Sequence, residues 1–83
     1  MKYEVQYKPI AQRDLEMLPR DLSARIVEKI ERMSDDLVGD VKRLTNFRPA
    51  FRLRVGDYRV LFDIEQNTVI IYRVRHRRDI YDR

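Results

Sequence analysis

The sequence predicts an α+β protein in which two helices pack against a mainly antiparallel sheet. Residues 2–8 alternate polar and apolar side chains, which is typical of a half-buried strand. Two stretches with helical spacing of apolar residues follow, and residues 51–75 then hold three more alternating stretches. Because helices and strands occupy separate parts of the chain, an α+β arrangement is favoured over alternating βαβ units. The expected order is an N-terminal strand, a two-helix hairpin and a three-stranded antiparallel meander.

Prolines mark the expected boundaries of the two helices. Pro9 suits the first turn of a helix, because its missing N–H and fixed φ cost nothing there. Ala11, Leu15 and Leu18 then share one helix face, and Pro19 ends the helix. A second helix is predicted to follow, with an apolar stripe that packs into the core. It spans about residues 20–36, and its stripe consists of Leu22, Ile26, Ile30, Met33 and Leu37.

Length and composition bound the architecture. The 83 residues are expected to form one domain, residues 1–83, held by packing alone because cysteine is absent. The stretch DDLVGDVKRLTNFRP has turn residues and little periodicity, so it is predicted to be a connecting loop. The alternating N-terminus is not typical of a signal peptide, and no apolar run approaches the roughly 20 residues of a membrane helix. We therefore expect a cytoplasmic protein without a membrane partner.

The first hairpin of the meander gathers like charges on one face. Gly56-Asp57 predicts a two-residue turn, which places Arg54 directly opposite Arg59. Arg52 lies two residues from Arg54, so all three arginines share a face. The alternating apolar residues then face the helices: Leu53, Val55, Tyr58, Val60 and Phe62. Opposed like charges destabilise a hairpin, so a well-patterned hairpin that carries them is a candidate functional site.

Two registers are open to the last strand, "VIIYRVR". A two-residue loop at residues 66–67 would turn Arg73 toward the core, whereas a three-residue loop at residues 65–67 places Arg73 opposite Arg59. We expect the second register, because the first would bury a charge. It adds Arg73 and Arg75 to the arginine face. It also buries Ile70, Tyr72 and Val74.

Basic residues are distributed unevenly along the chain. The formal net charge is +4. Residues 1–47 carry nine basic and nine acidic side chains, whereas residues 48–83 carry nine basic and five acidic ones. All nine basic residues of the second half are arginine. Arginine presents a planar, permanently charged fork that matches phosphate and stacks on bases, so this half of the chain favours a nucleic-acid partner.

The stretches FRLRVGDYRVLF and VIIYRVRHRRDIY resemble the RelE/ParE toxin superfamily of bacterial and archaeal toxin–antitoxin pairs. The matching patterns are G-x-Y-R before an apolar strand and H-R-x-x-x-Y near the end of the chain. The N-terminal strand and the helical pair also agree, so the resemblance covers essentially the whole chain. It implies a RelE-like, microbial RNase-like fold and a cognate antitoxin as partner. RelE-like members cleave messenger RNA in the ribosomal A site, whereas ParE-like members poison DNA gyrase and have no nuclease activity.

The resemblance to the RelE-like branch implies roles for individual residues. The functional basic residues before the turn match Arg52 and Arg54, and the arginine after it matches Arg59. The arginine and tyrosine of the tail match Arg77 and Tyr81. RelE-like toxins often have lysines at the positions of Arg52 and Arg54. Arginine effectively never loses its proton, so we do not expect either residue to act as a general base.

These residues suit metal-free cleavage of RNA by the ribose 2′-OH. Such a reaction needs proton transfer and stabilisation of extra negative charge on the phosphate. The only histidine, His76, is a further acid–base candidate because it titrates in the right range. We expect Arg59, Arg77 and Tyr81 to be catalytic, with phosphate bound by Arg52, Arg54, Arg73 and Arg75. No cofactor is expected, and no spacing in the sequence is typical of a metal site.

Three functions remain open from the sequence. The first is a ribosome-dependent messenger RNA endonuclease, an enzyme that inhibits translation. The second is a ParE-like gyrase inhibitor, a binding protein without catalysis. The third is a non-catalytic RNA-binding domain, which is disfavoured because no aromatic stacking residues are evident on the arginine face. The joint presence of the five matching residues favours the nuclease: Arg52, Arg54, Arg59, Arg77 and Tyr81.

Overall fold

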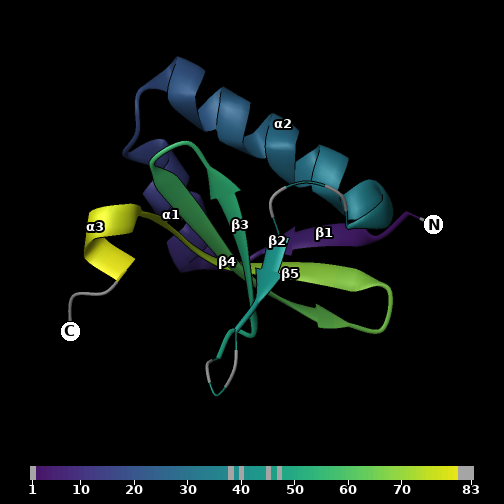
Figure 1. Ribbon diagram of the computed structural model, residues 1–83. Helices are drawn as coiled ribbons and strands as arrows, with labels where there is room; N and C mark the ends of the chain where they lie inside the picture. Colours follow the sequence, from purple (N-terminus) through teal and green to yellow (C-terminus); the bar gives the residue numbers. More distant parts are fainter. Residues whose placement is uncertain (1, 38, 40, 45, 47, 81–83) are drawn as a thin grey trace.

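The computed structural model describes residues 2–37, 39, 41–44, 46 and 48–80 (Figure 1). Within these residues the chain forms a five-stranded sheet in the order β1-β5-β4-β3-β2, with α1 and α2 packed on one side. The α+β class is therefore confirmed. The elements are β1 (Glu4–Tyr7), α1 (Pro9–Glu16), α2 (Arg20–Asp36), β2 (Val41–Arg43), β3 (Phe51–Val55), β4 (Tyr58–Glu65), β5 (Thr68–His76) and α3 (Arg77–Ile80).

Strands β2 to β5 form an antiparallel meander, and β1 pairs with β5 in parallel at the other edge. The meander thus has four strands, and the expectation of three was wrong. The additional strand is β2, which lies in the segment expected to be a loop and pairs with residues 51–53 of β3. Two of its three residues, Lys42 and Arg43, are exposed and charged, so the segment shows no apolar alternation. Residues 41–43 form a strand because they pair with β3, and this pairing cannot be predicted from the local sequence.

The helices follow the expected pattern closely. Pro9 stands at the start of α1, and α2 has the predicted bounds. α2 ends at Asp36, and the next residue, Leu37, has a left-handed φ of 56° that stops the helix. Figure 1 shows α2 lying across one face of the sheet. None of the helices in the described part of the chain is long and apolar enough to cross a membrane.

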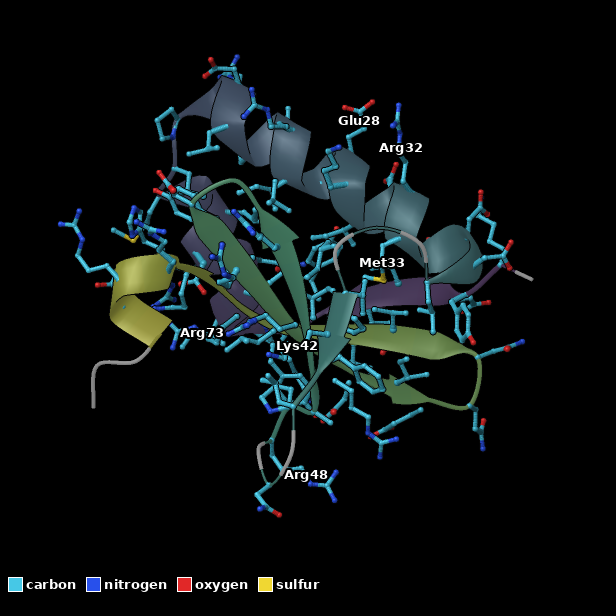
Figure 2. The ribbon with its side chains drawn as sticks, in the orientation of Figure 1. Glu28, Arg32, Met33, Lys42, Arg48 and Arg73 are labelled. Atoms are coloured by element: carbon cyan, nitrogen blue, oxygen red, sulfur yellow. The ribbon has the colours of Figure 1, made fainter. Side chains whose placement is uncertain are left out.

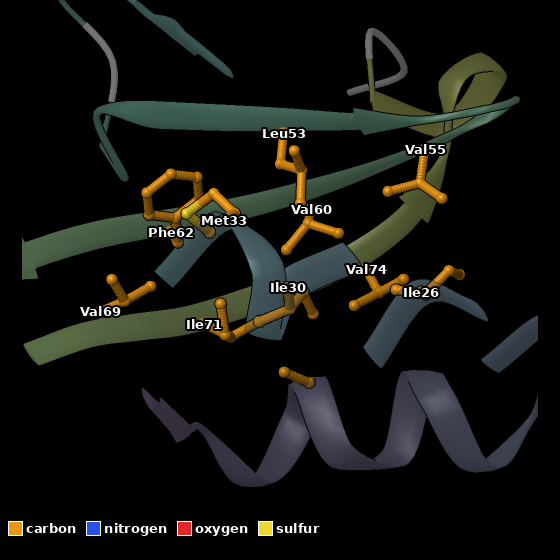
Figure 3. Close-up of a cluster of buried hydrophobic side chains, with 11 residues drawn as sticks. Ile26, Ile30, Met33, Leu53, Val55, Val60, Phe62, Val69, Ile71 and Val74 are labelled. Carbon is orange, nitrogen blue, oxygen red and sulfur yellow. The ribbon is translucent and has the colours of Figure 1, made fainter. Parts of the chain in front are cut away.

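The core lies between the helices and one face of the sheet (Figure 3). Ile26, Ile30 and Met33 of α2 are fully buried against it, as the apolar stripe predicts. The ring of Phe62 stacks on that of Phe51, with centroids 5.4 Å apart. The buried apolar residues are Ala11, Ile26, Ile30, Met33, Leu53, Val55, Val60, Phe62, Val69, Ile71 and Val74.

The register of the β3–β4 hairpin is confirmed. Val55 pairs with Tyr58, and Arg54 pairs with Arg59. Gly56 begins the turn with a φ of 58°, a left-handed value that glycine adopts without steric cost. The alternation then turns the apolar residues toward α2 and the arginines to the opposite face of the sheet.

The expected register of β5 was wrong. Glu65 pairs with Thr68, so the β4–β5 loop has two residues. A β-bulge near Leu61 then leaves Tyr72 without a partner residue on β4, and Leu61 pairs with Arg73. Arg73 therefore stays out of the core, although the loop is short. Both registers considered from the sequence assumed a regular strand. In the structure one extra residue of β5, Tyr72, shifts the pairing of the rest of that strand with β4 by one position.

The bulge also changes which residues of β5 are buried. Val69 and Ile71 face the core before the bulge, and Val74 faces it afterwards. Ile70 and Tyr72, which were expected to be buried, are only partly so. β5 thus contributes buried residues to the core from both sides of the bulge.

Substitution of Val60 by aspartate is expected to unfold the protein. Val60 is fully buried between the sheet and α2, so the variant must bury an unpaired carboxylate or open the core. Leu61→Asp is the matched control, because Leu61 is only partly buried and pairs with Arg52 and Arg73 on the opposite face. We expect Leu61→Asp to unfold cooperatively on heating and Val60→Asp to show no such transition. Equal melting curves for the two variants would contradict the assignment of faces.

Candidate functional site

Three arginines stand in one row across the sheet. Arg54 of β3 pairs with Arg59 of β4, and Arg59 pairs with Arg75 of β5. A second row holds Lys42 opposite Arg52. We call Arg52, Arg54, Arg59 and Arg75 the arginine face. It lies on the side of the sheet opposite α1 and α2, and four fixed positive charges on adjacent strands make it suited to a polyanion.

Arg59 is held beside the β3–β4 turn. Its Nη1 donates to the carbonyl oxygens of Gly56 and Tyr58, at 2.9 and 3.0 Å. The side chain is half-buried, whereas that of Arg54 is exposed. These two hydrogen bonds fix where the guanidinium stands, and a pre-positioned cation is what a phosphate-binding site needs.

The short helix α3 is fastened to the same turn. The backbone N–H of Arg77 donates to the carbonyl oxygen of Asp57 at 2.7 Å, and its Nε lies 3.9 Å from an Asp57 carboxylate oxygen. An open hollow of about 560 Å³ lies at this junction, lined by Asp57, Arg59, His76, Arg77 and Arg78. The structure therefore brings together three of the residues singled out from the sequence: Arg59, His76 and Arg77.

His76 is engaged through one of its two ring nitrogens. Its Nδ1 accepts a hydrogen bond from the backbone N–H of Arg78 at 3.1 Å. An accepting nitrogen carries no proton, so in this arrangement the ring hydrogen lies on Nε2. The ring also meets that of Tyr58 edge-on, with centroids 5.2 Å apart. Any proton transfer by His76 would therefore involve Nε2.

Arg73, expected to bind phosphate, has a protein partner. Its Nε and Nη2 donate to the two carboxylate oxygens of Asp14, at 2.8 and 3.2 Å. The hydrogen bond to Asp14, aided by the charge of that carboxylate and opposed by burial, raises the pKa of Arg73 above its ordinary value. Arg75, and not Arg73, stands opposite Arg59. The last of the expected site residues, Tyr81, lies outside the described residues.

A second basic surface lies between α2 and β3. A groove of about 530 Å³ has Leu53 and Val55 at its base, and its other lining residues are Arg25, Lys29, Arg32, Gly39, Arg54 and Gly56. Arg32 also pairs with Glu28 at 3.6 Å, and Figure 2 shows both on the side of α2 away from the sheet.

Sequence reasoning missed both the groove and the role of Asp14. Three basic residues of α2, Arg25, Lys29 and Arg32, recur at i, i+4 and i+7, a spacing that places them on one helix face and could have indicated the groove. Asp14 lies between Ala11 and Leu15 at the border of the apolar stripe, and no local pattern connects it to Arg73.

Comparison with known proteins places the chain in a family. A model described as "ParE toxin of type II toxin-antitoxin system, parDE" matches residues 5–81. The chain is 35% identical over 75 residues to Toxin RelE3 of Methanocaldococcus jannaschii, covering 84% of this chain and 85% of the relative. It is 38% identical to Toxin RelG of Mycobacterium tuberculosis over the full length of both.

A solved structure agrees with these relatives. The toxin–antitoxin complex RelBE2 of Mycobacterium tuberculosis contains a chain that is 34% identical, with a TM-score of 0.79 over 92% of this chain and 99% of that one. The family model carries the ParE name, whereas both relatives and the structure carry RelE or RelG names. The protein therefore belongs to the RelE/ParE superfamily of type II toxins, on its RelE-like side.

Proposed function

We propose that this protein is the toxin of a type II toxin–antitoxin pair and that it cleaves messenger RNA in the A site of the ribosome. The observation that carries the proposal is the convergence of Arg59, His76 and Arg77 at one hollow, beside the row formed by Arg54, Arg59 and Arg75. Fixed cations stabilise the extra negative charge that metal-free RNA cleavage builds on the phosphate, and His76 adds a second candidate for proton transfer to the same hollow. The RelE and RelG names of the relatives support the same branch.

The proposed reaction is attack of a ribose 2′-OH on the adjacent phosphorus. The 2′-oxygen loses its proton and bonds to phosphorus, the bond to the 5′-oxygen breaks, and that oxygen gains a proton. The products are a 2′,3′-cyclic phosphate and a 5′-hydroxyl. Arg59 and Arg77 stabilise the extra negative charge of the transition state, which is the largest electrostatic demand of the step. Arg52, Arg54 and Arg75 bind neighbouring phosphates and hold the message in place.

Proton transfer is assigned to Tyr81, with His76 as the alternative. A tyrosine hydroxyl can give up a proton and take one back, and Tyr81 matches the tyrosine of the RelE-like tail. His76 offers only Nε2, because Nδ1 is used by the backbone of α3. The arginines themselves cannot take part, since they effectively never lose a proton.

A site with so few acid–base groups depends on a substrate that is already positioned. The ribosome supplies such a substrate by presenting the message at the A site with its backbone held. The arginine face would then dock on phosphates of ribosomal RNA as well as on the message. Binding of this kind weakens steeply with added salt, because each contact releases condensed counterions.

Gyrase inhibition is the second candidate, and the ParE name of the matching family model favours it. The cationic surface described above would also suit a DNA-associated target, so charge alone does not separate the two functions. Cleavage of messenger RNA does separate them, because a gyrase inhibitor of the ParE type cuts no RNA.

A cognate antitoxin is the proposed protein partner, as in the complex RelBE2. We assign its contact to the groove between α2 and β3. Arg25 and Lys29 line this groove together with Leu53 and Val55, so an acidic amphipathic segment would match both its positive charge and its apolar base.

The proposed reaction is tested with messenger RNA programmed into purified ribosomes. We expect the protein to cut within the A-site codon and to leave a 2′,3′-cyclic or 3′-phosphate end, while free RNA is cut poorly. Arg59→Ala should remain folded, because it removes a like-charge contact opposite Arg54, yet it should cleave about 100- to 1,000-fold more slowly. Arg13→Ala, the loss of an exposed arginine on α1, is the control and should cleave normally. Intact ribosome-bound messages together with blocked supercoiling by gyrase would overturn the nuclease and support the second candidate.

Two conservative variants separate the acid–base candidates. Tyr81→Phe is expected to slow cleavage by roughly 100- to 10,000-fold without weakening ribosome binding, since it removes one hydroxyl and no charge. His76→Asn keeps an acceptor for the N–H of Arg78 but removes Nε2, and we expect it to change the rate less than about tenfold. The reverse result, a small effect at Tyr81 and a large one at His76, would transfer the role to Nε2 of His76.

Charge reversal tests the antitoxin contact. Lys29→Glu places a negative charge in the groove and is expected to weaken binding of the antitoxin by at least about tenfold, an effect of about 1.4 kcal/mol. The antitoxin used is a small protein shown by co-expression to relieve the toxicity of this chain, and its binding is measured by calorimetry at two salt concentrations. Arg13→Glu makes the same charge change on α1 and should bind as the parent does. Equal affinities for the two variants would place the contact elsewhere.

A further inference from the structure

In the middle of β5 the alternation between buried and outward-facing side chains is interrupted. Ile71 is buried opposite Phe62, and Val74 is buried opposite Val60. Val74 lies three positions after Ile71, an odd number, whereas a regular strand returns to the same face after an even number of positions. The bulge at Tyr72 supplies the extra residue.

Without the bulge the site would not form. Continuing the pairing of Phe62 with Ile71 in regular steps would set Arg73 opposite Val60 in the core and Val74 opposite Arg59. With the bulge, Val60 pairs with Val74 and Arg59 pairs with Arg75. The third arginine of the row is therefore present only because β5 contains an extra residue.

The carboxylate of Asp14 contacts the residues that follow the bulge. Pairing between β1 and β5 ends at Tyr7 and Ile71, and no other strand of the described residues lies beside this edge of β5 further on. Asp14 takes that place: one oxygen accepts from the backbone N–H of Val74 at 2.9 Å and from Nε of Arg73 at 2.8 Å. The other accepts from Nη2 of Arg73 at 3.2 Å. The Asp14 side chain is only 16% exposed, which strengthens these contacts.

The residues before and at the bulge are held by the start of the same helix. The backbone N–H of Lys8 donates to the carbonyl oxygen of Ile71 at 2.9 Å. The ammonium group of Lys8 lies 5.3 Å from the centre of the Tyr72 ring. Lys8 thus contacts the residue before the bulge, and Asp14 of α1 contacts the two residues after it.

We propose that Asp14 is a positioning residue of the site, whose carboxylate holds the β5 bulge and so keeps Arg75 opposite Arg59. Asp14 does not contact the arginine face, and it acts through the backbone of Val74 and the side chain of Arg73. Arg73 is then a partner of Asp14 and not a ligand of phosphate. The effect on cleavage rests on the proposed function, whereas the effect on strand register does not.

The test compares Asp14→Ala with Asp14→Asn and with the matched control Glu16→Gln. Glu16 is an exposed carboxylate on the same helix, so its variant loses the same charge without touching β5. Register is read by nuclear magnetic resonance from cross-strand contacts between Arg59 and Arg75, and the hydrogen bond is read from the exchange rate of the Val74 amide. Activity is the single-turnover cleavage rate on programmed ribosomes at saturating protein.

Asp14→Ala is expected to lose the contact between Arg59 and Arg75, to exchange the Val74 amide at least tenfold faster and to cleave at least tenfold more slowly. Because Arg75 holds the message in place, the variant should lower the rate at saturation and also raise the protein concentration that gives half the maximal rate. Asp14→Asn retains an acceptor for Val74, so it should keep the register and most of the activity while exchanging that amide faster. Glu16→Gln should match the parent in every measurement.

Retention of the contact between Arg59 and Arg75 in Asp14→Ala would overturn the proposal, as would loss of that contact with an unchanged cleavage rate. If the alanine variant does not fold, Asp14→Asn decides, since an unaltered exchange rate of Val74 in that variant would also overturn it. A parent protein that cuts no message would refute the nuclease but leave the register measurements as the test of Asp14.

Discussion

Burial of alternate residues of β3 and β4 beneath α2 determines where the arginines of the hairpin stand. Leu53 and Val60 form a pair in the core, so the neighbouring pair, Arg54 and Arg59, must point the other way. Sheet geometry allows no intermediate, because successive side chains alternate strictly between faces. The apolar core and the cationic surface are therefore two sides of one pattern. A change that loosens the core also loses the alignment of the charges.

The cost of gathering these charges is small compared with the core that enforces it. Opposed like charges on a sheet cost a fraction of a kcal/mol to about 1 kcal/mol per pair, whereas each fully buried aliphatic side chain contributes about 1.5–3 kcal/mol. The core can therefore outweigh the repulsion within a row of arginines. A bound polyanion removes the repulsion and adds attraction. The protein should accordingly be more stable when its surface is occupied by phosphates than when it is empty.

The spacing of apolar residues and the turn residues predicted the parts of the fold that are determined by neighbouring residues in the sequence. The period of apolar residues gave α2 its observed bounds, and Gly56-Asp57 gave the hairpin its register. The strand β2 and the bulge of β5 escaped prediction because both depend on contacts with distant segments. Asp14 and Arg73 are separated by 59 residues, and nothing in the neighbourhood of either indicates the other. On β5 the sequence placed Arg75 on the arginine face, but it set Arg73 opposite Arg59 because the bulge that moves Arg75 there was not predicted.

The parallel pairing of β1 with β5 joins the beginning of the chain to a strand made almost at its end. During synthesis β1 leaves the ribosome before the other strands of the sheet, yet its only neighbour in the described sheet, β5, is the last of these strands to emerge. Non-local pairing of this kind delays folding until the distant partner exists. Arg75 and the turn contact of Arg77 belong to the same late segment, so sheet and site are completed together. An incomplete nascent chain therefore holds neither the finished sheet nor the finished row of arginines.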